Sequence, residues 1–123
     1  MFEGSESSGK HMICDFKNIK NNELLNDCSK LNNILQHICK EYDFQILNET
    51  SHIFEPIGCS ILFLLSESHI SIHTFPEKKH MSFDIYTCRQ YKDNEDYNKI
   101  FHFLVDKLDA SIDSKCEIIN RYF

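Results

Sequence analysis

The sequence lacks the features of a membrane protein and of a nucleic-acid-binding protein. The longest uninterrupted apolar run, Ile61 to Leu65, is far shorter than the roughly 20 residues that span a bilayer. Lysine and arginine number 13 against 19 aspartate and glutamate residues, for a formal net charge of −6. Because phosphate contacts dominate nucleic-acid affinity, an acidic chain without a basic stripe is expected to bind neither nucleic acid nor a membrane.

The motifs of a zinc site are missing as well. The six cysteines, at positions 14, 28, 39, 59, 88 and 116, include no CxxC pair. The nearest histidine–cysteine pair, His37 and Cys39, would face different sides of a helix, so no metal is expected. The chain begins with polar residues and shows no apolar stretch typical of a signal peptide. We therefore expect a cytoplasmic protein with reduced thiols.

No repeat, low-complexity segment or linker divides the 123 residues, which suit a single domain with one core. Apolar periodicity predicts strands at 11–16, 44–54, 59–65, 68–75, 81–88 and 115–122, and helices at 22–41 and 93–108. Asn22 is the expected cap of the first helix. Residues 1–8 read as a loose tail. The unbroken apolar run at 59–65 predicts a strand that is covered on both faces.

Two amphipathic helices and one sheet predict an α+β fold, a two-layer sandwich of a mostly antiparallel sheet with both helices on one face. The other sheet face is left uncovered. Alternation within the strands places His73, Phe75, Tyr86 and Cys88 on that face. An aromatic-rich open face indicates a ligand or a partner, and a homodimer packed sheet against sheet is the simplest expectation.

One segment carries a specific pattern, SESHISIHTFPE at residues 66–77. Three further motifs keep a consistent spacing around it: Gly9, Lys10 and His11; His52, Phe54, Pro56, Gly58 and Ser60; and Asp84, Thr87 and Cys88. Together they resemble the short prokaryotic type of S-adenosylmethionine decarboxylase proenzyme, a pyruvoyl-dependent enzyme. The resemblance covers nearly the whole chain.

This resemblance implies a self-processing step. Ser68 would attack the carbonyl of Glu67 and convert the peptide bond to an ester. Loss of the Ser68 α-proton would then break the chain and leave a pyruvoyl group at position 68 as the cofactor. His73 matches the processing base of the family, a role that suits an imidazole. Ser60 matches a serine that supports processing. The products would be a beta chain, 1–67, and an alpha chain, 68–123.

The resemblance also implies roles in the decarboxylation of S-adenosylmethionine, which supplies the aminopropyl donor for spermidine. The pyruvoyl carbonyl would form a Schiff base with the substrate amine and accept the electrons left by carbon dioxide. Cys88 matches the proton donor. Phe54 and Phe75 match the rings that sandwich the adenine, and Glu77 matches the carboxylate on the ribose hydroxyls.

Two departures from the family pattern stand near these residues. Phe75 replaces the usual tryptophan and offers a smaller ring for stacking. Arg89 replaces the usual glycine after Cys88 and would either narrow the site or place a positive charge near that thiol. Two alternatives remain open from sequence alone: a pyruvoyl decarboxylase of arginine or ornithine on the same fold, and a non-catalytic homologue that regulates a partner.

Overall fold

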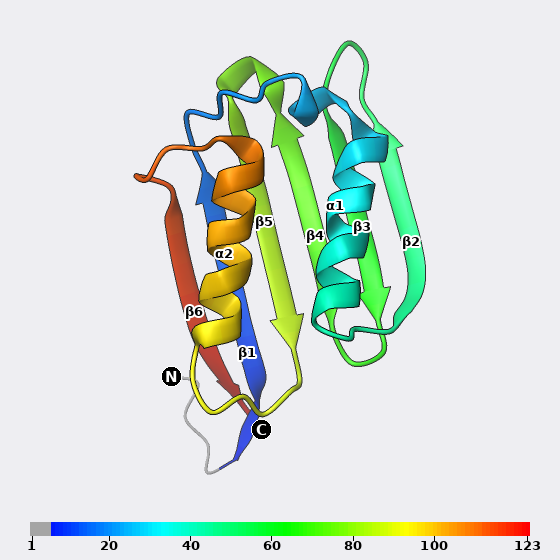
Figure 1. The fold of residues 1–123 in the computed structure, drawn as a ribbon. Coiled ribbons are helices and arrows are strands. Elements are labelled where there is room, and N and C mark those ends of the chain that lie inside the picture. Colours follow the sequence, from blue (N-terminus) through cyan, green and yellow to red (C-terminus); the bar gives the residue numbers. More distant parts are fainter. Residues whose placement is uncertain (1–5) are drawn as a thin grey trace.

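An antiparallel sheet with two helices on one face forms the described part of the molecule, residues 6–123 of a computed structural model (Figure 1). Along the chain the elements are β1 (Ser7–Phe16), η1 (Leu24–Asn26), α1 (Cys28–Glu41), β2 (Ile46–Ile53), β3 (Cys59–Leu65), β4 (His69–Phe75), η2 (Pro76–Lys78), β5 (His80–Thr87), α2 (Glu95–Leu108) and β6 (Lys115–Tyr122). The strand order is β2-β3-β4-β5-β1-β6. The predicted two-layer α+β fold is confirmed.

The core lies between the helices and one face of the sheet. Each helix turns one apolar stripe toward the strands, as helical periodicity requires. The buried stripes consist of Leu31, Leu35, Ile38 and Cys39 on α1, and Tyr97, Ile100, Leu104 and Leu108 on α2. They pack against alternate residues of the strands, among them Met12, Phe63, Ile72 and Ile85, each at most 2% exposed. Within residues 6–123, this packing leaves the opposite sheet face without a covering layer.

The first helix begins later than the sequence predicts. Residues 22–27 form a turn and the short η1, in which Leu24 and Leu25 are buried, and α1 starts at Cys28. The cap is Asp27, whose carboxylate accepts a hydrogen bond from the Lys30 backbone N–H at 3.0 Å. An aspartate at this position satisfies an otherwise unpaired amide of the first turn, so the prediction of Asn22 as the cap was wrong.

Strand boundaries shift by a few residues from those predicted, and β1 is longer at its start. Because β1 begins at Ser7, the predicted tail is wrong for residues 7 and 8, whereas residues 1–5 lie outside the described part. The prediction that β3 is covered on both faces was also wrong. Its residues alternate, and Leu62 and Leu64 are 46% and 54% exposed on the open face. The apolar run in β3 therefore supplies both a core face and an exposed apolar face.

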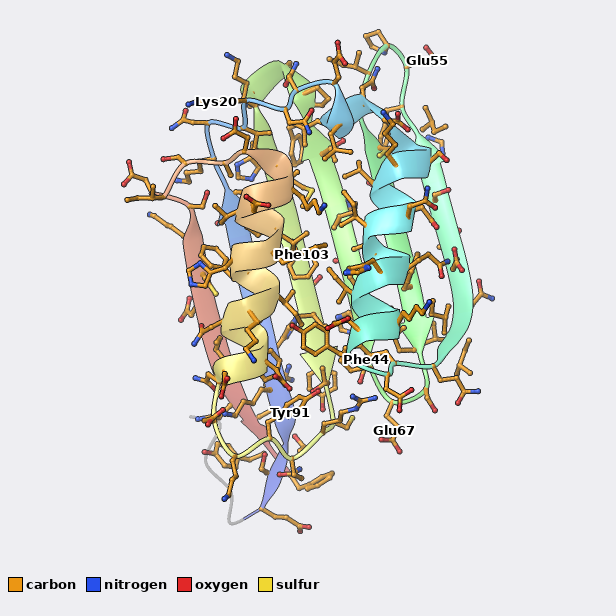
Figure 2. The ribbon with its side chains drawn as sticks, viewed as in Figure 1. Lys20, Phe44, Glu55, Glu67, Tyr91 and Phe103 are labelled. Atoms are coloured by element: carbon orange, nitrogen blue, oxygen red, sulfur yellow. The ribbon has the colours of Figure 1, made fainter. Side chains whose placement is uncertain are left out.

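The turn between β3 and β4 and the loop between β2 and β3 lie at opposite ends of the sheet. The turn between β3 and β4 lies at one end, where β5 also finishes, and Glu67 marks it in Figure 2. The loop between β2 and β3 lies at the opposite end, marked by Glu55 in the same view, next to η2. Among residues 6–123, no helix combines the length and apolar character needed to cross a bilayer.

Candidate active site

Glu67, Ser68 and Cys88 meet at the end of the sheet where β4 starts and β5 finishes; we call them the cleavage half-site. A tight turn precedes β4, in which the Leu65 N–H donates to the Ser68 carbonyl at 2.9 Å. The β4–β5 ladder continues toward Cys88 and brings its thiol to the Glu67 carbonyl oxygen, with 2.7 Å between Sγ and O. That carbonyl belongs to the peptide bond joining Glu67 to Ser68.

Neighbours of Cys88 explain how the thiol reaches this position. Gly9 has φ +123°, and a Cβ there would lie 1.9 Å from the Thr87 carbonyl oxygen, so only glycine lets β1 and the end of β5 approach. The Tyr86 hydroxyl donates to the Ser8 carbonyl at 2.6 Å and lies 3.6 Å from the Cys88 thiol as a second acceptor. The sequence motifs included Gly9 but assigned it no role, and they did not include Tyr86.

At the opposite end of the sheet, five of the predicted residues gather as a second group, which we call the pocket half-site. Phe54, Ser60, His73, Phe75 and Glu77 line one pocket of about 490 Å³. Ser60 and His73 are direct partners in the β3–β4 ladder, and 2.6 Å separates Ser60 Oγ from His73 Nδ1. This contact orients the imidazole and fixes which ring nitrogen faces the pocket.

The pocket half-site also presents apolar surface beside its polar groups. Phe54 and Phe75 are 47% and 40% exposed. The His52 ring packs edge-on against Phe54, with 4.6 Å between the ring centroids, which gives His52 a supporting place that sequence reasoning could not assign. Two exposed rings and one carboxylate around a pocket can hold a flat heterocycle and its hydroxyl groups.

The structure does not bring the predicted residues together in a single site within one chain. Ser68 and His73 are joined by β4, and at about 3.3 Å per residue this strand separates them by roughly 16 Å. The pocket half-site lies on the open sheet face, since Ile70 and Ile72 point into the core and alternate with His73. The Cys88 thiol lies on the same face as the Tyr86 hydroxyl, 3.6 Å from it, whereas Ser68 follows the alternation of Ile70 and Ile72 and lines a hollow beside Phe44 and Arg89. In this structure His73 therefore does not reach Ser68 of the same chain.

Arg89 directs its guanidinium to the segment that follows α1. Its guanidinium donates to the backbone carbonyls of Tyr42 and Asp43, just beyond the end of α1, and lies 4.3 Å from the Phe44 ring centroid. Cationic donors are favourable at a helix C-terminus, where carbonyl groups lack partners. Arg89 thus fastens α1 to the loop that follows β5, next to a hollow of about 390 Å³ that Glu67 and Ser68 also line.

Comparison with known proteins establishes the family of this chain. The family model for S-adenosylmethionine decarboxylase matches residues 10–121, which is nearly the whole chain. The chain belongs to the S-adenosylmethionine decarboxylase family. The resemblance found in the sequence motifs is confirmed.

Relatives within the S-adenosylmethionine decarboxylase family agree with this assignment. An S-adenosylmethionine decarboxylase proenzyme 2 of Bacillus cereus is 42% identical over 80 residues, which are 65% of this chain and 64% of that protein. The proenzymes of Thermosipho africanus and Clostridium botulinum (strain Langeland) are each 32% identical, over 84% and 82% of this chain and 76% and 84% of their own. The match thus spans less than two thirds of the Bacillus relative.

A solved structure confirms the fold of this chain. The crystal structure of the adenosylmethionine decarboxylase from Aquifex aeolicus VF5 superposes with a TM-score of 0.82, over 97% of this chain and 94% of that chain. Sequence identity between the two is 21%, so this likeness concerns the arrangement of helices and strands.

Between the half-sites, the open face carries a polar network centred on Asp84. One carboxylate oxygen lies 2.5 Å from His11 Nε2 and 2.9 Å from His69 Nε2, and the other accepts a hydrogen bond from Ser71. Burial alone would raise the pKa of Asp84, but the hydrogen bonds from Ser71, His11 and His69 outweigh it and lower that pKa below 3.8. The network anchors His69, the residue that directly follows Ser68.

Three residues of this network, His11, His69 and Asp84, are close enough together to be considered as ligands of a metal ion. Ligand atoms of His11, His69 and Asp84 lie within 4.8 Å of one another. Arg121, however, donates to His11 Nδ1 at 3.4 Å, which leaves the His11 proton on Nε2, the nitrogen that would bind the metal. Metal-binding histidines normally donate from their second nitrogen to an acceptor. The arrangement therefore fits a hydrogen-bond network better than a metal centre.

The Asp84 network predicts a pH-dependent contribution to stability. Because the folded-state pKa of Asp84 lies below 3.8, its contribution is fully present above that pH and is lost as the pH falls through the folded-state value. We expect Asp84→Asn to lower the free energy of unfolding by about 1.5–3 kcal/mol at pH 7. The difference from wild type should shrink below about pH 4. Urea unfolding at fixed protein concentration measures both values.

A matched control for this prediction is Asp15→Asn. Asp15 also carries a carboxylate on the sheet, but its side chain is 48% exposed and its contact with His80 is 3.6 Å long. Exposed pairs of this kind contribute little. Equal losses from the two variants, or a loss for Asp84→Asn that persists unchanged at pH 3, would contradict the role given to the Asp84 network.

Proposed function

We propose that this chain is an S-adenosylmethionine decarboxylase that cuts itself between Glu67 and Ser68 and works as a homodimer. Family membership supports the reaction class. The observation that carries the proposal is the pair of half-sites at opposite ends of one sheet: a thiol on the carbonyl of the bond to be cut, and a serine–histidine pair beside an aromatic pocket. Each holds part of the machinery that the reaction requires.

The proposed cleavage begins at the Ser68 hydroxyl. Its oxygen attacks the Glu67 carbonyl carbon, the hydroxyl proton passes to the Ser68 nitrogen, and the bond from that nitrogen to the Glu67 carbon breaks, so that the amide becomes an ester. The Cys88 thiol, 2.7 Å from the Glu67 oxygen, donates a hydrogen bond to the negative charge that develops there. Removal of the Ser68 α-proton by His73 then expels the Glu67 carboxylate. Hydrolysis of the resulting dehydroalanine releases ammonia and leaves a pyruvoyl group at position 68.

His73 must reach Ser68 from a second copy of the chain, because roughly 16 Å of β4 separates them within one protomer. A two-fold axis perpendicular to the strands would place the cleavage half-site of one protomer against the pocket half-site of its partner, twice per dimer. The open face offers apolar surface for such contact, including Ile13, Leu62 and Leu64. The proposed dimer packs sheet against sheet.

The pocket half-site supports S-adenosylmethionine as the substrate. Phe54 and Phe75 would stack on the adenine and attract the sulfonium cation, an interaction of about 0.5–2 kcal/mol. Glu77 would accept hydrogen bonds from the ribose hydroxyls. The pyruvoyl group supplies a carbonyl that takes up electrons as carbon dioxide leaves, and Cys88 returns a proton to the substrate carbon. The product would feed spermidine synthesis in the cytoplasm.

The intact mass of the purified protein tests this function. We expect two fragments, 1–67 and 68–123, in equal amounts, with the second blocked to Edman degradation because its terminal pyruvoyl group has a ketone in place of the amine. Incubation with S-adenosylmethionine labelled at the carboxyl carbon should release labelled carbon dioxide. A single chain that stays uncut and releases none would contradict the proposal and favour the non-catalytic regulatory homologue. Release from arginine or ornithine alone would favour the alternative decarboxylases.

A further inference from the structure

Two cysteines far apart in the sequence face each other across the β1–β6 ladder. Cys14 on β1 and Cys116 on β6 are direct partners in the antiparallel register. Opposite residues in such a ladder have Cα atoms about 4.5–5.5 Å apart and point to the same side of the sheet. Disulfide-bonded cysteines have Cα atoms about 4.4–6.8 Å apart. The register thus places this pair within the range of Cα separations that disulfides use.

The two thiols differ in access and in acidity. Cys14 is 1% exposed within the core, whereas Cys116 is exposed on the edge strand beside a hollow of about 400 Å³. A hydrogen bond from the Cys14 thiol lowers the pKa of Cys116, and the same bond, followed by burial, raises the pKa of Cys14. An accessible thiol of lowered pKa next to a second cysteine is the arrangement of a thiol that reacts first and is then resolved by its neighbour.

We propose that Cys116 and Cys14 form an oxidant-dependent disulfide that holds the two chains of the cleaved protein together. This inference deepens the proposed function, because it rests on a cut between residues 67 and 68. Cys14 lies in the fragment before that bond and Cys116 in the fragment after it. Without the disulfide, the fragments are joined only by the packing and the strand ladders between them.

The chemistry requires a disulfide oxidant, for which oxidised glutathione serves as the probe. The Cys116 thiolate attacks one glutathione sulfur, which forms a mixed disulfide and expels one glutathione thiolate. Cys14 then loses its proton, its sulfur attacks the Cys116 sulfur, and the second glutathione thiolate leaves. The protein loses two electrons and two protons, and the oxidant gains both as two glutathione thiols.

The other cysteines cannot produce the same link from their positions in the fold. Cys28 and Cys59 are also neighbours, since the pKa of the Cys59 thiol is raised to about 11 first by burial and also by Cys28. Both belong to the fragment before residue 68, so a bond between them would join nothing across the cut. Cys39 is buried on the core-facing side of α1, and Cys88 contacts the Glu67 carbonyl. A bond between Cys14 and Cys116 can therefore be distinguished from a bond between Cys28 and Cys59, because it joins the two fragments.

The test uses purified, processed protein incubated with oxidised glutathione, then alkylated at its free thiols and run on denaturing gels. We expect the wild type to migrate as one full-length band without reductant and as two fragments with it. Two of the six thiols should become resistant to alkylation. Cys116→Ser and Cys14→Ser should give two fragments under both conditions, with Cys14→Ser retaining a glutathione adduct on Cys116.

Cys28→Ser is the matched control and should behave as the wild type. Cys116 is exposed, so its variant keeps the result readable even where Cys14→Ser disturbs the core. Fragments that separate without reductant while six thiols still react would overturn the proposal, as would a disulfide between Cys116 residues of two molecules. If the chain is uncut, a reducing gel shows one band and the proposed function fails. Loss of two thiols, mapped to the peptides of residues 14 and 116, still tests the disulfide.

Discussion

Co-expression of Ser68→Ala chains with His73→Ala chains is expected to restore cleavage that neither variant shows alone. Within one chain, roughly 16 Å of β4 lies between the two residues, so neither protomer can complete its own site. In a mixed dimer, the Ser68→Ala chain donates its intact His73 to the Ser68 of its partner. Only the His73→Ala chain should be cut, which a tag on one of the two chains reveals.

The size of this rescue follows from the symmetry of the dimer. Random assortment makes about half of the dimers mixed, and each contains one complete site out of two, so activity should reach about one quarter of the wild-type value. Co-expression of His73→Ala with Ser60→Ala is the control, because both changes fall in the pocket half-site and no complete site arises. No fragments from the first mixture would show that the site is not shared, and cutting of His73→Ala alone at the wild-type rate would show that His73 is not the processing base.

The open sheet face is the part of the fold that the sequence predicted best. Strand alternation assigned Ile70 and Ile72 to the core and His73 and Phe75 to the other face, and the structure confirms this. Alternation is reliable here because one face packs on helices and the other does not. The start of α1 was missed because Leu24 and Leu25 fit the helical pattern, yet they are buried from a turn and the short η1.

The division into two half-sites was not predicted, although part of the signal was present. Family motifs identify residues that act together, but they do not say whether one chain or two supply them. Ser68 and His73 were both assigned to one predicted strand, whose rise per residue already places them too far apart for direct contact. The contacts of Cys88 and Arg89, by contrast, depend on how β5 and the loop after it meet other segments. Sequence spacing does not contain that information.

Cys88→Ala is expected to slow both self-cleavage and turnover, whereas the sequence predicted a role in turnover only. The Cys88 thiol lies 2.7 Å from the carbonyl oxygen that gains negative charge when Ser68 attacks. Removing one donor to such an oxygen costs roughly 100- to 1,000-fold, and a thiol is a weak donor, so the lower figure is expected for cleavage. Loss of the proton donor should reduce kcat roughly 100- to 10,000-fold.

Cys88→Ser separates these two roles, because a hydroxyl donates a hydrogen bond well but gives up its proton far less readily than a thiol. We expect Cys88→Ser to be cut faster than Cys88→Ala, yet to turn over about as slowly. Time courses of fragment formation and carbon dioxide release from the cleaved protein measure the two steps separately, with Cys28→Ser as the control cysteine. Equal cleavage rates for the alanine and serine variants would show that the contact with the Glu67 carbonyl does not assist the cut.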